Sequence, residues 1–264
     1  LGLSQILDFE RDPGDRNRTS PFAFTGNRFE FRAVGSAQSV SGPLVAMNTI
    51  LADSLEWIAE KLQAELSSGK EKAAAVISVL QTLMKEHGNA VFGGDGYSSE
   101  WHIKAVTERG LKNIPTTADA LPALLGDSVK KLFETTGVLS PVELESRYEV
   151  YSEQYILSIQ VEAKLMVEMA KTLIYPAASH YMTGLADANA SMASMDIELD
   201  SSVAKTVATE TNAMMTAVTK LNAALKKEDF ASTEEHMKYF ATEILSLMNE
   251  VRIHADLLEG EVAD

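Results

Sequence analysis

Apolar residues recur at helical spacing over most of this chain. Between Pro43 and Leu62 they are separated by three or four positions, as expected for the buried face of an α-helix. Comparable runs cover residues 70–85, 141–175, 199–227 and 232–258. Pro43 suits the first turn of its helix, and Ser140-Pro141-Val142-Glu143 has the form of a capping box. The pattern therefore predicts a mainly α-helical fold.

The last of these runs carries a heptad seam. Its members follow one another at alternating steps of three and four residues: Met237, Phe240, Ile244, Leu247, Val251, His254 and Leu258. The preceding run offers a second apolar seam: Val207, Met214, Val218, Leu221 and Leu225. A single helix cannot bury such a seam, so we expect an antiparallel pair or a bundle.

Two local signals set expected helix ends. Pro176 lacks an amide hydrogen and its ring clashes with the carbonyl four residues earlier, so we expect a kink or break after Tyr175. Gly93-Gly94-Asp95-Gly96 reads as a loop, and Ser98 or Ser99 would cap the helix after it. The loop lacks the lysine and spacing of a P-loop, which favours an interhelical turn or a subunit-interface loop over a phosphate cradle.

The first 34 residues follow a different pattern. In a β-strand, Arg28, Glu30 and Arg32 would share one face at steps of about 6.5–7 Å, with Phe29 and Phe31 on the other. Two guanidinium groups beside a carboxylate suit a metal ion held with several anionic groups. The simpler alternative is a surface strand whose charges pair with a neighbouring strand. A lone strand must pair, and we expect its partners upstream of the first residue.

Composition narrows the classes of function. The chain has 264 residues, a formal net charge of -15 and no cysteine. Such a charge argues against binding nucleic acid or an anionic membrane surface, because both are polyanionic. No apolar run is long enough to cross a bilayer, and no disulfide framework or cysteine metal site is available. We therefore expect a cytoplasmic protein. The arginines near the N-terminal end could still form a cationic pocket for small anionic substrates, although the chain as a whole is acidic.

Other motifs accompany the charged strand and carry a family resemblance. Asn17-Arg18-Thr19-Ser20 precedes the strand, while FGGDGYSSEW at 92–101 and SRYEVY at 146–151 follow it. Together with Arg28-Phe29-Glu30-Phe31-Arg32 they resemble type III glutamine synthetases, from about residue 15 to at least residue 181. The resemblance implies a mainly α fold with a short β segment. Residues 1–66 would end the catalytic domain, and residues 67–264 would form the helical C-terminal domain of this class.

The resemblance also implies an activity for a longer enzyme of which this chain would be the C-terminal part. Glutamine synthetases transfer the γ-phosphoryl group of ATP to glutamate, and ammonia then displaces phosphate from γ-glutamyl phosphate to give glutamine. The implied requirements are Mg²⁺ or Mn²⁺ with ATP as co-substrate. The implied assembly is a ring-shaped homo-oligomer, such as a dodecamer.

Four residues of this chain match the family's functional positions. By resemblance Glu30 is a metal ligand and Arg32 binds the α-carboxylate of glutamate, while Arg28 contacts nucleotide phosphates and Arg18 stabilises the transferring phosphoryl group. Ala23 stands where the common pattern has another arginine, which weakens the role of Arg28 most. The family's other metal ligands, its glutamate loop and its N-terminal β-domain have no counterpart here. We therefore expect this chain alone to be inactive.

Two other interpretations remain open at this point. A non-catalytic relative could use the same fold as a scaffold, although Arg18, Glu30 and Arg32 are all retained. A helical interaction module with an incidental charged strand is the third hypothesis. The sequence upstream of the first residue would distinguish the three interpretations. Metal-ligand glutamates there would favour the enzyme, and their replacement would favour the scaffold. An unrelated domain there would favour the interaction module.

Overall fold

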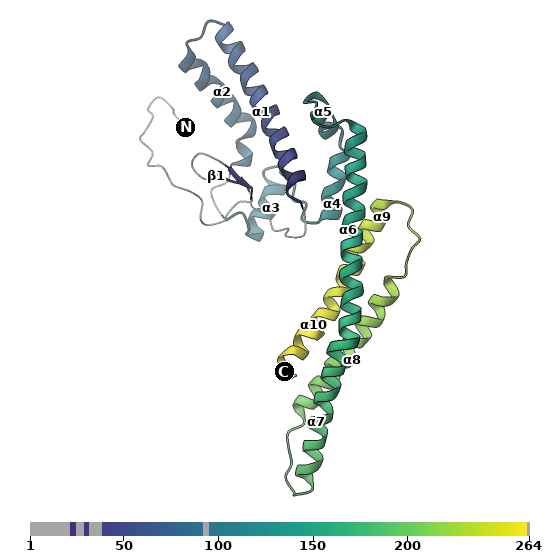
Figure 1. Ribbon diagram of the computed structural model, residues 1–264. Coiled ribbons are helices and arrows are strands. Elements are labelled where there is room, and N and C mark those ends of the chain that lie inside the picture. Colours follow the sequence, from purple (N-terminus) through teal and green to yellow (C-terminus); the bar gives the residue numbers. More distant parts are fainter. Residues whose placement is uncertain (1–21, 25–28, 32–38, 92–94, 263–264) are drawn as a thin grey trace. The chain divides into compact units, whose positions relative to one another are not determined.

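The computed structural model describes residues 22–24, 29–31, 39–91 and 95–262 (Figure 1). The chain forms two compact units. Unit 1 comprises Leu1–Ile114 and Asp127–Pro141, and unit 2 comprises Pro115–Gly126 and Val142–Asp264. Helices make up most of both units, so the prediction of a mainly α-helical fold is confirmed.

A short hairpin carries the described strands of unit 1. β1 (Phe22–Phe24) pairs antiparallel with β2 (Phe29–Phe31), and the register sets Ala23 opposite Glu30. The β segment expected around residues 28–32 is thus reduced to three described residues. The expectation that its partners precede the first residue was wrong for one edge, because β1 occupies that edge. A two-stranded hairpin is marginal in water and depends on further contacts.

The long helices of unit 1 form a helical hairpin. α1 (Ser41–Ser67) packs against α2 (Lys72–His87). Gly69 turns the chain between them at a φ of +89°, a conformation that other residues rarely adopt. Glu65, near the end of α1, forms an ion pair with Lys70 in the same turn, and the hydrogen bond from Lys70 lowers the pKa of Glu65.

Shorter helices complete unit 1: η1 (Gly88–Ala90), α3 (Ser99–Thr107) and α5 (Asp127–Thr135). Ser98 Oγ accepts a hydrogen bond from the amide of Trp101 at 3.2 Å, so the predicted serine cap is confirmed at Ser98. α5 contacts α1 and buries Phe133. Unit 1 therefore combines a helical hairpin with shorter helices, of which α3 has a serine cap.

Unit 2 is a bundle of three long helical segments among its described residues (Figure 1). The segments are α6 (Pro141–Met169), η3 (Ala170–Ile174) and α7 (Tyr175–Ala193); α8 (Ser202–Ala224); and α9 (Thr233–Tyr239), η4 (Phe240–Ile244) and α10 (Leu245–Glu261). Short connections between consecutive segments reverse the chain direction each time, which gives an antiparallel arrangement. Two short helices lie on the unit, and the first contacts α9: α4 (Thr117–Ala120) and η2 (Leu121–Leu125).

A kink or a break was expected after Tyr175, and the break does not occur. The helix runs from α6 through η3 into α7, and η3 is a π-helical turn in which the amide of Tyr175 donates to the carbonyl of Ala170. This wider turn leaves room between the proline ring and the backbone carbonyls that precede it. Pro176 has no amide hydrogen, so it leaves no hydrogen-bond donor unpaired. The prediction of a break was wrong because a π-helical turn, and not an α-helical one, precedes Pro176. The alternative of a kink stays a prediction.

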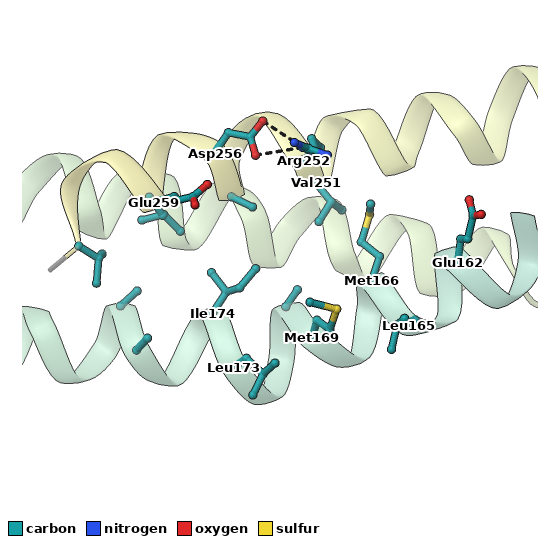
Figure 2. Close-up of a pocket in the computed structure, with 16 residues that line it drawn as sticks. Glu162, Leu165, Met166, Met169, Leu173, Ile174, Val251, Arg252, Asp256 and Glu259 are labelled. Carbon is teal, nitrogen blue, oxygen red and sulfur yellow. Dashed lines mark hydrogen bonds and ion pairs between the residues drawn. The ribbon is translucent and has the colours of Figure 1, made fainter. Parts of the chain in front are cut away.

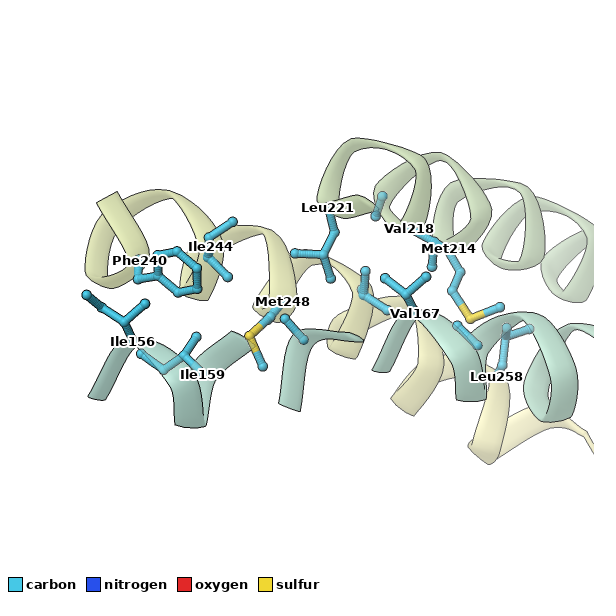
Figure 3. Close-up of a cluster of buried hydrophobic side chains, with 14 of the residues drawn as sticks. Ile156, Ile159, Val167, Met214, Val218, Leu221, Phe240, Ile244, Met248 and Leu258 are labelled. Atoms are coloured by element: carbon cyan, nitrogen blue, oxygen red, sulfur yellow. The ribbon is translucent and has the colours of Figure 1, made fainter. Parts of the chain in front are cut away.

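The core of unit 2 is made by the two predicted seams and by α6 (Figure 3). The third segment buries most of its predicted positions: Met237, Phe240, Ile244, Val251 and Leu258. α8 buries four of its five: Val207, Met214, Val218 and Leu221. α6 completes the cluster with Ile156, Ile159, Ala163 and Val167. The predicted bundle is confirmed, with Leu225, Leu247 and His254 partly exposed at its edges.

Candidate functional site

Glu30 is the predicted site residue that the structure places, and its position is given by the backbone of the hairpin. It is the middle residue of β2 and lies opposite Ala23 of β1. Arg18, Arg28 and Arg32 lie outside the described residues. The grouping of their guanidinium groups around Glu30 therefore remains a prediction.

The described residues contain no group of three His, Asp or Glu side chains close enough together to hold a metal ion. Glu30 supplies a carboxylate, the donor type that Mg²⁺ and Mn²⁺ prefer. An octahedral ion needs about six oxygen ligands, so one carboxylate is only part of a coordination sphere. The donor chemistry of Glu30 fits a divalent ion if further ligands come from beyond the described part of the chain.

The residues before the glycine-rich loop are held by hydrogen bonds to Arg109, two positions after α3 ends, and a local hydrogen bond forms after the loop. Asn89 Nδ2 donates to the carbonyl oxygen of Arg109 at 2.8 Å, and Arg109 Nη1 donates to the carbonyls of Asn89 at 3.2 Å and Val91 at 2.6 Å. Asp95 accepts a hydrogen bond from the amide of Tyr97 at 2.9 Å. These contacts fix described residues next to the loop. Gly93 and Gly94 lie outside the described residues, so the interpretation of this loop as an interhelical turn or a subunit-interface loop stays a prediction.

Two histidines of unit 2 make defined side-chain contacts. His254 Nδ1 on α10 lies 2.7 Å from Glu210 Oε2 on α8, and both side chains are half-buried. His236 stacks on Phe230 with ring centroids 4.1 Å apart, and burial lowers the pKa of His236. The sequence analysis missed the Glu210–His254 pair. Its signal was an acidic residue three positions after Val207, on the edge of a seam that faces another seam with histidine.

An apolar groove of about 700 Å³ is the second feature that the sequence analysis missed (Figure 2). It lies within unit 2, between the continuous helix α6–η3–α7 and α10. Figure 2 shows Met166 and Ile174 on the first wall and Val251 on the second. The signal was a second apolar stripe on the long helix, of which only the last three members line the groove: Leu157, Val161, Leu165, Met169 and Leu173.

Among the described helices, none has the length and apolar content that a membrane span requires. Two candidate features stand out among the described residues, the Glu30 hairpin of unit 1 and the groove of unit 2. They differ in kind, because the hairpin carries the charged motif and the groove is mostly apolar.

Comparison with known proteins finds similarity along the whole chain. The sequence model of the glutamine synthetase C-terminal domain matches residues 75–193. A type-3 glutamine synthetase from Dictyostelium discoideum is 38% identical over 100% of this chain and 37% of its own length. Glutamine synthetases from Bacteroides fragilis (strain YCH46) and Butyrivibrio fibrisolvens are each 31% identical, over 100% and 98% of this chain and 37% of their own lengths.

The chain thus spans about 37% of the length of the curated relatives that it matches. The similarity runs through both units and includes the segment with the charged motif, since the first two alignments cover all of the chain. The chain belongs to the glutamine synthetase family and corresponds to the C-terminal part of its type-3 members.

Proposed function

We propose that the longer protein that contains this chain is a glutamate–ammonia ligase, which forms glutamine from glutamate, ammonia and ATP. The observation that carries the proposal is the similarity over the full chain to proteins named glutamine synthetase. The retained charged motif supports it further, because phosphoryl transfer depends mainly on positioning and charge neutralisation. Residues 1–66 would end the catalytic domain, and residues 67–264 would form the helical domain.

In this proposal each charged residue has one task. Glu30 contributes one carboxylate to a divalent ion, which when bound would neutralise charge on the ATP phosphates. Arg32 would hold the α-carboxylate of glutamate through paired hydrogen bonds, and Arg28 would contact nucleotide phosphates. Arg18 would stabilise the γ-phosphoryl group as it moves to the glutamate side chain. Ammonia would then displace phosphate from the γ-glutamyl phosphate.

The exposed face of α1 supports the packing of unit 1 on further catalytic structure. Thr49 is the one buried residue of α1, whose residues are all described. Leu44, Leu51 and Leu55 lie on its surface with 42–55% of their area exposed. An upstream catalytic domain would cover these side chains, because α1 follows the charged motif directly in the chain. As the family resemblance implies, we also propose a cytoplasmic, ring-shaped homo-oligomer such as a dodecamer.

The decisive experiment uses the full-length protein with Glu30→Gln. We expect this change to abolish most glutamine synthesis and to weaken the dependence on Mg²⁺ or Mn²⁺, since it removes a charged metal ligand of the same size. Initial rates measured over a metal titration test both effects. Glu56→Gln is the control and should keep the wild-type rate, because Glu56 is exposed and lies about 100° around α1 from the stripe of Leu44, Leu51 and Leu55. Wild-type rates and metal dependence in Glu30→Gln would remove Glu30 from the site.

A further inference from the structure

The groove of unit 2 is an incomplete helical bundle. The continuous helix α6–η3–α7 and α10 lie side by side in Figure 2, and α8 packs on both α7 and α10. The groove is lined by residues between Glu162 and Ala178 of the long helix and by residues between Val251 and Val262 at α10. A fourth antiparallel helix laid in it would complete a four-helix bundle, the common solution for apolar faces of this kind.

The dimensions of the groove suit a helix. Its first wall extends from Glu162 to Ala178, which is about 24 Å at the rise of an α-helix. Leu165, Met169 and Leu173 follow one another at four-residue steps along that wall, and each has 42–59% of its area exposed. A helical partner with apolar residues at three- and four-residue steps can cover such a stripe along its length.

The charges at the groove specify the partner further. Three carboxylates line it, from Glu162, Asp256 and Glu259, against the single guanidinium of Arg252. Arg252 Nε lies 3.0 Å from both carboxylate oxygens of Asp256, so this cation is already engaged (Figure 2). The groove therefore has an excess of negative charge at an apolar floor.

We propose that this groove binds an amphipathic helix of another protein, with lysine or arginine on the edges of its apolar stripe. Basic edges would pair with Glu162 and Glu259, while the apolar stripe would cover Leu165 and Leu173. A second copy of this chain matches this rim less well, because its formal charge of -15 gives it an excess of acidic groups. The proposed homo-oligomer would then use other surfaces of the chain.

Two synthetic helical peptides of about 16 residues test the proposal, a length that matches the groove. Both peptides carry leucine at the helical spacing i, i+3, i+4 and i+7. They differ only at the positions beside the leucines, which are lysine in one peptide and glutamate in the other. Fluorescence anisotropy with the 264-residue chain should show binding of the lysine peptide, about tenfold or more tighter than the glutamate peptide at low salt.

Matched substitutions locate the binding site on the chain. Leu173→Asp should weaken binding of the lysine peptide about tenfold, since it puts a charge on the apolar wall. Leu157→Asp is the control and should keep wild-type affinity, because Leu157 lies on the same long helix and is 57% exposed, against 59% for Leu173, but does not line the groove. Leu165→Asp repeats the test at a second wall position, and circular dichroism checks that each variant keeps its helix content.

Three results would overturn the proposal. The first is no binding of the lysine peptide, and the second is equal binding of both peptides. The third is self-association of the chain, measured by analytical ultracentrifugation, that Leu173→Asp abolishes and Leu157→Asp does not. That last result would assign the groove to a second copy of the chain.

Discussion

The two units bury their apolar residues to different extents. In unit 2, buried side chains from all three long segments join one continuous cluster. Among the described side chains of unit 1, only a few are buried, and they are spread over several helices: Thr49, Ala75, Val79, Ala105 and Phe133. Most of the apolar face of α1 is open. The difference indicates that unit 2 is stabilised by its own core. Under the proposed function, unit 1 would gain stability from an upstream catalytic domain that covers α1.

The largest effect should come from truncating the core of unit 2. Leu258→Ala is expected to lower the free energy of unfolding by about 2–4 kcal/mol, because Leu258 is 1% exposed and packs in the cluster. Leu257→Ala is the neighbouring control, at 50% exposure, and should change that free energy by no more than about 0.5 kcal/mol. Urea unfolding followed by far-ultraviolet circular dichroism measures both.

The same variant tests whether the units are energetically separate. Both tryptophans of the chain, Trp57 and Trp101, belong to unit 1, so tryptophan fluorescence reports on that unit alone. Leu258→Ala should shift the transition seen by circular dichroism and leave the fluorescence transition in place. An equal shift of both transitions would contradict the independence of the unit 2 core.

An intermediate effect is expected at the open face of α1, and it should depend on the rest of the protein. In this chain alone, Leu55→Gln should change the free energy of unfolding by no more than about 0.5 kcal/mol, since Leu55 is already exposed. In the full-length protein, the buried amide should cost about 1–3 kcal/mol. Glu56→Gln serves as control, and equal small effects of Leu55→Gln in both proteins would show that this face stays open.

The smallest effect should be a pH dependence within unit 2. The folded pKa of His236 lies below its ordinary value of 6.5, because burial against Phe230 and Phe240 disfavours its charged form. The unfolded chain therefore binds the proton more readily, and the free energy of unfolding should fall as pH drops from above 6.5 through the folded pKa.

His236→Phe should remove this part of the pH dependence while keeping an aromatic ring at the stack. His180→Gln, at an exposed histidine of α7, provides the comparison. Urea titrations at several pH values between neutrality and mild acid measure the slope. A slope unchanged by His236→Phe would assign the pH dependence to other groups.

The sequence predicted most of the bundle, because heptad spacing reports directly on which residues face a partner helix. The seams of α8 and of α9–η4–α10 were found in this way, and so was the serine cap of α3. The stripe from Leu157 to Leu173 was missed, since the long helix is apolar on two sides and one period cannot describe both. Glu210 was missed because its partner, His254, is distant in sequence and only the fold brings them together.

For the charged motif, the sequence remains the stronger source. Alternation predicted a strand around Glu30, and three residues of it pair with β1. The pairing with β1 was not predicted, because Phe22–Phe24 is too short to stand out by alternation. The roles of Arg18, Arg28 and Arg32 rest on the family motif, and a metal sphere built from distant segments leaves no local pattern in this chain.

The π-helical turn before Pro176 constrains how the long helix can change in length. Such a turn holds one residue more than the α-helical path needs, so the side chains after it are rotated relative to those before it. Deleting a single residue from Ala170–Ile174 would close the turn and press the proline ring against a carbonyl. If Pro176 were replaced first, the same deletion would be tolerated. Related proteins should therefore carry both changes together, or the replacement of Pro176 alone, but not the deletion alone.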